Sequence, residues 1–123
     1  MTPLKVALVG HCGPDSYMLR SAVKHVLPDA QIAMIDDSAA LNMAITDGVT
    51  VLLVNRVLGY GFDADNGVGL IGALRASHPQ LKLLLISNYA DAQAQAVAAG
   101  AMPGFGKNNI GSPKMREALA AVK

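Results

Sequence analysis

Apolar residues in this chain form short unbroken runs, separated by segments in which they recur at helical spacing. The most uniform run is Val49–Asn55, which reads Val-Thr-Val-Leu-Leu-Val-Asn. A run of β-branched and aliphatic residues is typical of a central parallel strand with both faces buried. We therefore expect Asn55 to end this strand at the edge of an open α/β sheet, where such sheets usually carry their ligands.

Other short apolar runs predict four further strands. They are Lys5–Val9, Gln31–Ile35, Leu81–Ile86 and Met102–Phe105. The last contains Pro103. Because proline has no N–H to donate, this run suits an edge strand better than a central one.

The segments between these runs predict helices. Apolar positions after the turn Gly10–Asp15 recur at helical spacing until Pro28, and Asp15 or Ser16 is expected to cap this helix. The helix over Asp91–Ala99 is mostly Ala and Gln, so its thin apolar face makes it a candidate for movement. The other helices are expected after the acidic cluster 36–38, over Gly67–Ser77, and after Ser112-Pro113.

Alternating strands and helices at short spacing predict a parallel sheet covered on both faces and joined by right-handed crossovers. The length of 123 residues suits a single domain, with the boundaries 1–123. A composition that is 52% hydrophobic and 15% charged is that of a compact folded chain.

The charge distribution gives no field that would concentrate nucleic acid or acidic lipid, since the net charge is +1. We therefore expect neither nucleic acid nor a membrane as a partner. Cys12 is the single cysteine and cannot form an internal disulfide, and the N-terminal residues lack the pattern of a secretion signal. These features favour a cytoplasmic protein.

Two residues at the ends of the expected strands, together with the alternation and the length, resemble the receiver domain of bacterial response regulators. Ser87 ends the run Leu-Leu-Leu-Ile-Ser, and Lys107 follows the last strand. The resemblance covers nearly the whole chain. It implies a flavodoxin-like doubly wound (βα)5 sandwich, with a five-stranded parallel sheet of order 2-1-3-4-5.

The resemblance also implies a site, and this chain departs from it. In the family, an aspartate ending the third strand accepts a phosphoryl group, and two acidic residues after the first strand hold magnesium. Asn55 stands at the first position and Gly10-His11 at the second. Gly104 replaces the aromatic switch residue expected three positions before Lys107. The chain thus resembles an atypical, degenerate receiver, or pseudo-receiver.

The degenerate phosphorylation site comprises Asn55, Ser87, Lys107, Gly10 and His11. An acyl phosphate requires a carboxylate nucleophile, and an amide is too weak a nucleophile to replace it. Magnesium needs oxygen ligands, usually including a carboxylate. We therefore predict no phosphorelay through this site, no catalysis, no metal and no cofactor.

Residues of the degenerate site also allow purely structural interpretations. The Lys107 ammonium could donate to the Asn55 amide oxygen and hold the loops in one conformation, or it could remain solvated. Ser87 is more typical of a strand-end hydroxyl that caps local backbone than of a moving switch.

His11 and Cys12 are adjacent, which raises the possibility of a metal site or a reactive thiol. No other His/Cys cluster supports it, so ordinary turn residues are the stronger interpretation. The segment Asp63–Gly67 resembles part of a calcium loop, but its glycine comes one position early. Catalysis by Cys12 ranks last because no base is placed near it.

The leading hypothesis is a phosphorylation-independent signalling module that acts by protein contact in a two-component-type pathway. Its partner would be a kinase, an output protein or a second copy of the chain. Tyr60 and Phe62, on the loop Arg56–Asn66, and Phe105 are the expected contact residues. Both loop rings could instead fold down and fill the vacant pocket. By the resemblance, the partner face comprises residues 91–99, 102–105 and 112–122.

The alternative hypothesis is a flavodoxin-like protein that binds a small ligand or nucleotide through the turn Gly10–Asp15. A phosphate could lie at the start of the first helix, where backbone N–H groups are free. The turn lacks the three-glycine spacing of dinucleotide-binding proteins.

Overall fold

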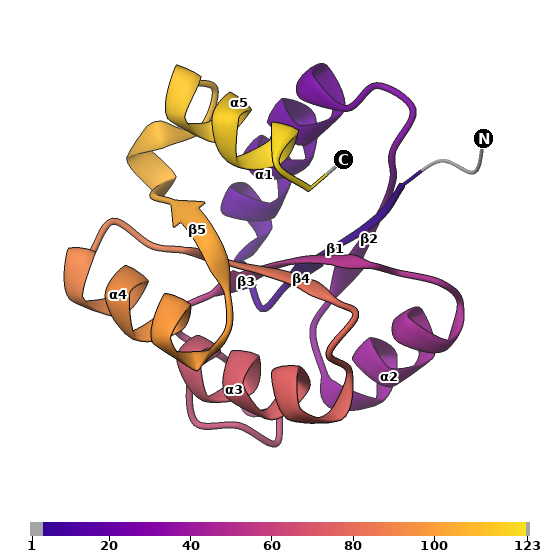
Figure 1. Ribbon diagram of the computed structural model, residues 1–123. Helices are drawn as coiled ribbons and strands as arrows, with labels where there is room; N and C mark the ends of the chain where they lie inside the picture. The colour runs from indigo at the N-terminus through magenta and orange to yellow at the C-terminus, as the bar shows by residue number, and fades with distance from the viewer. Residues whose placement is uncertain (1–3, 123) are drawn as a thin grey trace.

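The structure is a computed structural model that describes residues 4–122. Its sheet has five parallel strands in the order β2-β1-β3-β4-β5 (Figure 1), which confirms the predicted flavodoxin-like fold. The strands are β1 (Lys5–Val9), β2 (Gln31–Ile35), β3 (Val51–Asn55), β4 (Lys82–Ile86) and β5 (Met102–Phe105). The helices are α1 (Gly13–Val26), α2 (Ser38–Thr46), α3 (Gly67–Ser77), α4 (Ala90–Ala99), the short 3-10 helix η1 (Lys107–Asn109) and α5 (Pro113–Ala120).

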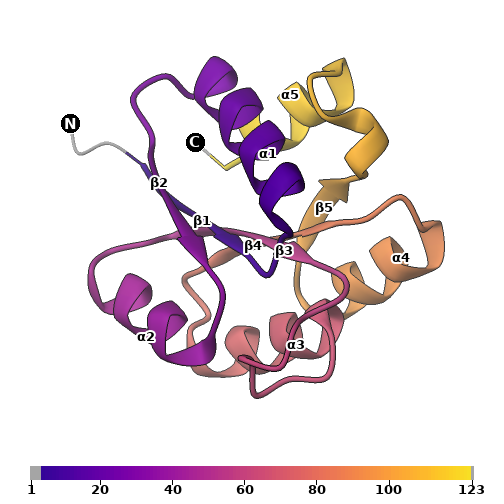
Figure 2. The same ribbon diagram turned by 180° about the vertical axis from the view of Figure 1, so that it is seen from behind.

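Helices cover both faces of the sheet. α1 and α5 lie on one face, and α2, α3 and α4 lie on the other (Figures 1 and 2). Because alternate side chains of a strand point to opposite faces, β3 contributes Val51 and Leu53 to the α1/α5 side and Leu52 and Val54 to the other. Two apolar cores therefore hold the sheet between the helix layers.

The register of the sheet determines which loops meet at its carboxyl edge. Val9 pairs with Val54, and Asn55 pairs with Ile86. Ile86 in turn pairs with Phe105, after a register shift between Leu84 and Ile86. The residues that follow β1, β3, β4 and β5 therefore lie together at one edge.

The start of α1 differs from the prediction. The helix begins at Gly13 with Cys12 as its N-cap, and no side chain caps it. Pro14 suits the first turn because that turn needs no N–H from it, so the helix starts before Asp15 and Ser16. Asp15 consequently lies within the first turn, where its carboxylate is available for another contact.

The remaining boundaries follow the sequence closely. Asp37 caps α2 by accepting a hydrogen bond from the Ala40 N–H at 2.7 Å, as the acidic cluster predicted. Gly100 ends α4 in the left-handed region at φ 116°. β3 is two residues shorter than its apolar run, but Thr50 still pairs with neighbouring strands through its backbone. Within residues 4–122, no helix combines the length and apolar character needed to cross a bilayer.

Candidate functional site

Asn55 ends β3 with its side-chain amide facing two backbone carbonyls. Its Nδ2 donates to the carbonyl oxygen of Gly10 at 3.1 Å and to that of Val57 at 2.9 Å. An amide can make both bonds, whereas an ionised carboxylate has no proton to donate and would face the same two oxygens. The local geometry therefore favours the amide and disfavours an aspartate in its ionised form.

Gly10 follows β1 at a position that no side chain could occupy without rearrangement. Its φ is +76°, and a Cβ built on it would lie 2.6 Å from Cδ2 of Leu58 and 3.7 Å from Cε2 of Phe62. Positive φ favours glycine over other residues. Hydrocarbon thus fills the space in which the family resemblance expects an acidic side chain.

The two aromatic rings of the β3–α3 loop lie in different environments. Tyr60 is fully exposed, whereas Phe62 has an exposed fraction of 8% and packs in the core between the sheet and α2 and α3. The expectation that Phe62 contacts a partner is therefore wrong for this conformation. Its ring instead lies over the β1 end of the site. The second interpretation, in which both loop rings fold down, is thus correct in direction for Phe62 and wrong for Tyr60, which stays exposed.

Tight packing against the α2 N-terminus explains why Phe62 turns inward. The Ser38 N–H donates to the Gly61 carbonyl at 2.9 Å, and the Asp63 N–H donates to the Ser38 hydroxyl oxygen at 2.9 Å. A Cβ on Gly61 would come within 2.7 Å of the Asp36 carbonyl oxygen. The absence of a side chain at Gly61 therefore allows close contact with α2. The two hydrogen bonds hold the loop on either side of the Phe62 ring.

Phe105 is completely buried, in the core on the α1/α5 side of the sheet. The expectation that its side chain binds a partner is wrong, because strand alternation directs the ring into that core.

His11 is a buried structural residue. Its Nε2 donates to the Leu53 carbonyl oxygen at 2.9 Å, and its Nδ1 has no hydrogen-bond partner among residues 4–122. Burial is the main cause that lowers the pKa of His11 below 6.5, so the ring is neutral in the folded protein at pH 7. Cys12, by contrast, is exposed. Across the described residues, no three His, Cys, Asp or Glu side chains come together as a metal site would require.

Lys107 forms an ion pair with Asp15, with 2.8 Å between Nζ and Oδ2. Of the two interpretations left open for Lys107, the bond to the Asn55 amide is not formed, and the ammonium group pairs with a carboxylate that neither interpretation named. A hydrogen bond from Lys107, followed by one from Cys12, lowers the pKa of Asp15. The early start of α1 explains the pair, because it brings Asp15 into the turn that faces Lys107.

Ser87 is buried at the end of β4, where its hydroxyl oxygen accepts a hydrogen bond from the Tyr89 N–H at 3.2 Å. This confirms the prediction that the hydroxyl caps local backbone. Ser87, Asn55 and Lys107 also line one pocket of about 280 Å³, together with Arg56, Val57, Ile86, Asn88 and Tyr89. The structure thus brings three of the five predicted site residues together there, while Gly10 and His11 do not line it.

Sequence reasoning missed Gln93, which fastens α4 to the sheet. Its Nε2 lies 2.9 Å from the Leu85 carbonyl oxygen, 3.0 Å from that of Ser87 and 3.3 Å from that of Phe105. A Cβ on Gly104 would overlap the Leu85 carbonyl and lie 3.0 Å from the Gln93 amide oxygen. This explains why no aromatic side chain stands at Gly104. The available signal was a glutamine beside Ala92, on the buried side of an alanine-rich helix.

Sequence reasoning also missed the contact between Arg56 and Tyr89. The Arg56 guanidinium carbon lies 4.7 Å from the centroid of the Tyr89 ring. This is within the range of a cation–π interaction. It joins the end of β3 to the start of α4 at the rim of the pocket.

The fold is that of receiver domains. RcsB of Salmonella typhimurium is 16% identical over 99% of this chain and 60% of that chain, with a TM-score of 0.81. The receiver domain of a DNA-binding response regulator from Colwellia psychrerythraea is 14% identical over 97% of each chain, with a TM-score of 0.74. The receiver domain of NtrX from Brucella abortus is 22% identical over 95% of this chain and 92% of that chain, with a TM-score of 0.65.

Sequence comparison adds nothing to this structural likeness, since no family model and no curated protein matches the chain. This chain spans about 60% of the length of the RcsB chain. Identities this low show a shared fold, and function must be argued from the site itself.

Proposed function

We propose that this chain is a receiver-like signalling module that acts through protein contact, without phosphorylation, in a two-component-type pathway. The observation that carries the proposal is the pair of hydrogen bonds from the Asn55 amide to Gly10 and Val57. These bonds hold the Asn55 side chain against the local backbone, at the position where the family resemblance expects the acceptor aspartate.

Magnesium and catalysis have no role in this proposal. Neither β1 nor β3 ends in a carboxylate, and Leu58 and Phe62 fill the space beside Gly10. Asp15, the nearby acid, is engaged by Lys107. Because Mg²⁺ dehydrates reluctantly and generally needs a carboxylate, this set of ligands is poor for it.

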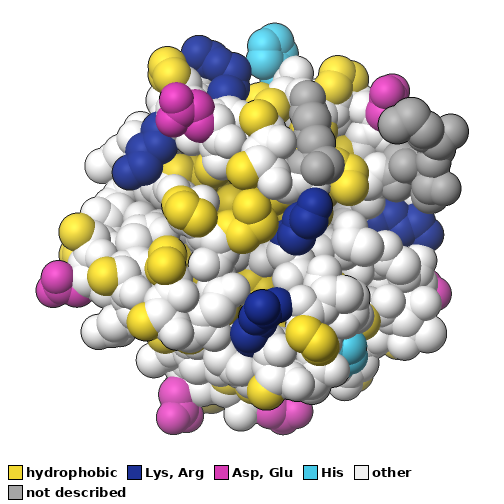
Figure 3. Space-filling model, in the orientation of Figure 1, with side chains coloured by type: hydrophobic (Ala, Val, Ile, Leu, Met, Phe, Trp, Pro, Cys, Tyr) yellow, Lys and Arg dark blue, Asp and Glu magenta, His cyan; other side chains and the backbone are white. Residues whose placement is uncertain are grey.

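The proposed partner is another signalling protein: a kinase, an output protein or a second copy of this chain. Figure 3 shows apolar side chains gathered beneath α5, at the centre of the face that carries α4, β5 and α5. Val97 on α4 has an exposed fraction of 47%, and the exposed Tyr60 lies on a loop that is held in place. Large apolar and aromatic side chains on rigid elements favour protein contact.

Nucleic acid and membranes are not proposed as partners. RcsB of Salmonella enterica has been solved bound to promoter DNA, and this chain spans 68% of that longer chain. The net charge of +1 here gives no surface field suited to DNA or to acidic lipid. We propose a cytoplasmic location, which suits a receiver-like module.

The test is incubation with a small phosphodonor and Mg²⁺, followed by intact mass, with an ordinary receiver as positive control. We expect the positive control to gain a phosphoryl group and this protein to remain unmodified. A stable phosphoryl group on any side chain would contradict the proposed mechanism. Light scattering over a range of concentrations would then separate self-association from contact with a different protein.

A further inference from the structure

β2 forms one edge of the sheet, and no other described strand lies on its outer side (Figures 1 and 2). The Gln31 N–H donates to the Leu4 carbonyl oxygen at 2.8 Å, on the side that faces β1. Because backbone groups alternate in direction along a strand, the N–H and C=O groups of Ile32 and Met34 point away from β1. No residue within 4–122 pairs with these four groups.

The opposite edge of the sheet, β5, is less suited to pairing with another strand. It contains Pro103, which has no N–H to donate, and its register with β4 shifts between Leu84 and Ile86. β2 has the sequence Gln-Ile-Ala-Met-Ile, without proline or a charged residue, and it pairs with β1 without a shift. Proline, charges and bulges are the usual protection of an edge, so β2 is open to an added strand.

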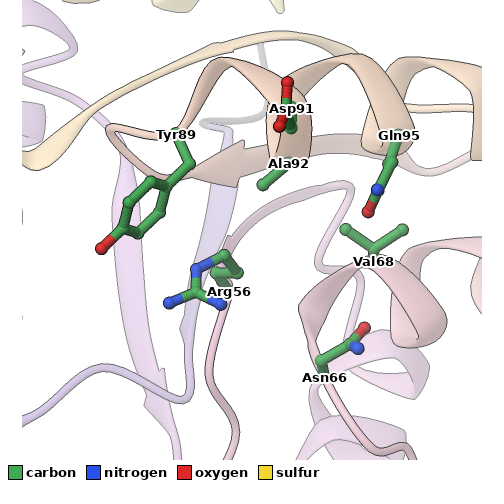
Figure 4. A pocket seen from close by; sticks show the side chains of 7 residues that line it. All are labelled: Arg56, Asn66, Val68, Tyr89, Asp91, Ala92 and Gln95. Carbon is green, nitrogen blue, oxygen red and sulfur yellow. The ribbon is translucent and has the colours of Figure 1, made fainter.

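An apolar groove lies beside β2, on the side of the sheet that carries α2. It has a volume of about 460 Å³, and its apolar walls include Ile32, Ala33, Ile35, Ala40, Met43 and Ala44. The pocket in Figure 4, by contrast, has the charged side chains of Arg56 and Asp91 among its seven lining residues. Met34 and Met43 have exposed fractions of 51% and 68%. The groove and its rim can therefore accept the apolar side chains of an added strand.

Acidic side chains surround this edge. Between residues 27 and 55 the chain has no Lys, Arg or His, and its acids there are Asp29, Asp36, Asp37 and Asp47. All four are exposed, and none forms an ion pair with another residue within 4–122. Lys5 and Lys24 lie nearby, but each donates to a backbone carbonyl, of Asp47 and Pro28 respectively. Basic residues beside an added strand would thus meet carboxylates that lack a cationic partner.

A second copy of this chain fits the edge poorly. Two β2 strands related by a two-fold axis run antiparallel, so Asp29 of one copy would lie near Asp36 and Asp37 of the other. The symmetry repeats this arrangement at both ends of the pair. Like charges that face each other across paired strands are destabilising, so the charges favour a different polypeptide as the occupant.

We propose that β2 is a docking site for an extended segment of another protein, which adds to the sheet as a further strand and carries alternating apolar residues flanked by Lys or Arg. Backbone hydrogen bonds to Ile32 and Met34 supply affinity, and the apolar side chains on one face of the segment enter the groove. Its basic residues pair with the surrounding carboxylates. The inference goes beyond the proposed function, because β2 lies at the edge of the sheet opposite to the proposed partner face.

The test is a titration of the full chain with the capped peptide Lys-Lys-Thr-Val-Thr-Val-Thr-Lys-Lys, followed by backbone ¹H–¹⁵N resonances. We expect saturable shifts at residues 31–35 and 40–47. Absence of saturable shifts, or shifts confined to α1 and α5, would overturn the proposal.

N-methylated peptides test strand addition itself while the protein stays unchanged. One peptide is methylated at its Val residues and the other at its Thr residues. Because alternate N–H groups of a strand point in opposite directions, only one of the two sets faces β2. We expect one peptide to bind at least about tenfold more weakly than the parent and the other to bind within about twofold of it. Equal affinity of the two peptides would contradict backbone pairing.

Charge reversal tests the role of the acids. A peptide with Glu in place of every Lys should bind about tenfold more weakly, and the double variant Asp29→Lys plus Asp36→Lys should reverse this preference. Asp91→Lys, on α4, is the matched control and should keep the preference of the wild type. Asp37 stays unchanged because it caps α2. The same preference in the double variant as in the wild type would overturn the proposal.

Resonances far from β2 report whether each variant remains folded. Shifts of the β2 resonances as the protein concentration rises, without peptide, would assign the edge to a second copy and contradict the proposal. Peptide binding requires no phosphoryl group, so the phosphodonor experiment does not affect it. A failure of the peptide to bind likewise leaves the argument against phosphorylation unchanged.

Discussion

The two halves of the sheet's carboxyl edge are lined by different kinds of side chain in this protein. In the closed half, comprising Gly10, His11, Leu58 and Phe62, hydrocarbon and a neutral buried imidazole fill the space beside β1. In the open half, comprising Arg56, Ser87, Asn88 and Lys107, polar donors surround a pocket. Both halves belong to the same fold, and they differ in the side chains that line them.

This comparison teaches that two ends of one sheet edge can be filled by different kinds of side chain. Leu58 and Phe62 occupy the space beside Gly10, so an acidic side chain placed there would meet packed side chains. The hydroxyl and ammonium groups of the open half remain accessible from the pocket. Substitutions should therefore act mainly on stability in the closed half and mainly on ligand or partner contacts in the open half.

The largest effect on stability should come from removing the Phe62 ring from the closed half. Phe62→Ala removes a buried ring and leaves a cavity, so we expect a loss of about 3 kcal/mol in the free energy of unfolding. Tyr60→Ala, two residues away on the same loop, is the matched control and should change it by less than about 0.5 kcal/mol because the ring is exposed. Urea unfolding measures both. Similar losses in the two variants would show that the rings are not packed differently.

A Cβ at Gly10 should be the next most damaging change. Gly10→Ala combines positive φ with a collision against Leu58, and we expect a loss of about 2–3 kcal/mol. Gly111 also has positive φ, at +85°, but a Cβ there meets nothing within 4 Å. Gly111→Ala should therefore cost only about 1 kcal/mol. Equal losses in urea unfolding would mean that Leu58 moves aside freely.

Placing an aspartate at position 55, where the family resemblance expects the acceptor, should destabilise the protein. Asn55→Asp loses two donated hydrogen bonds and places a carboxylate against two carbonyl oxygens, which should cost about 2 kcal/mol at pH 7. Asn88→Asp is the control. The Asn88 side-chain oxygen accepts the Asn108 N–H, which a carboxylate can also do, so little stability should be lost. An Asn55→Asp protein that is as stable as the wild type would contradict the assigned amide geometry.

Lowering the pH should destabilise the folded protein because His11 is buried in its neutral form. The pKa of His11 is lowered from 6.5 by burial, so the unfolded chain binds a proton more readily than the folded protein does. Stability should consequently fall as the pH drops below about 6.5, until the folded imidazole is also protonated. We expect His11→Gln to flatten this slope in urea unfolding between pH 7 and pH 5, and His25→Gln, on the exposed side of α1, to retain it. An unchanged slope in His11→Gln would show that another group titrates.

The smallest effect should come from the ion pair of the open half. Asp15→Asn should lower the free energy of unfolding by about 0.5 kcal/mol at pH 7, because the pair with Lys107 is partly exposed. Concentrated NaCl should reduce the difference from the wild type. Because the pKa of Asp15 is lowered in the folded protein, the stabilisation by the ion pair is present above about pH 3.8. It is lost as the pH falls below that value. A large effect that does not respond to salt would mean that the pair is more strongly coupled than its exposure indicates.

Local pattern was sufficient to predict the elements of this fold. The run ending at Asn55 became the central strand, and Gly67–Ser77 is a helix with the predicted bounds. The Ser87 hydroxyl caps the backbone two residues away, which short-range chemistry predicts. The mobility expected of α4 stays a prediction, although Gln93 adds an anchor that its alanine face did not indicate.

By itself, the sequence determined the parallel sheet with its two helix layers, and also the absence of an acid where Asn55 stands. Both are properties of neighbouring residues, whose periodicity and side-chain chemistry do not depend on distant contacts. Tertiary structure alone decided that Phe62 is buried while Tyr60 is exposed, and that Lys107 pairs with Asp15. Those outcomes depend on how segments far apart in the chain pack together, because distances across the fold, and not spacing along it, determine which side chains meet.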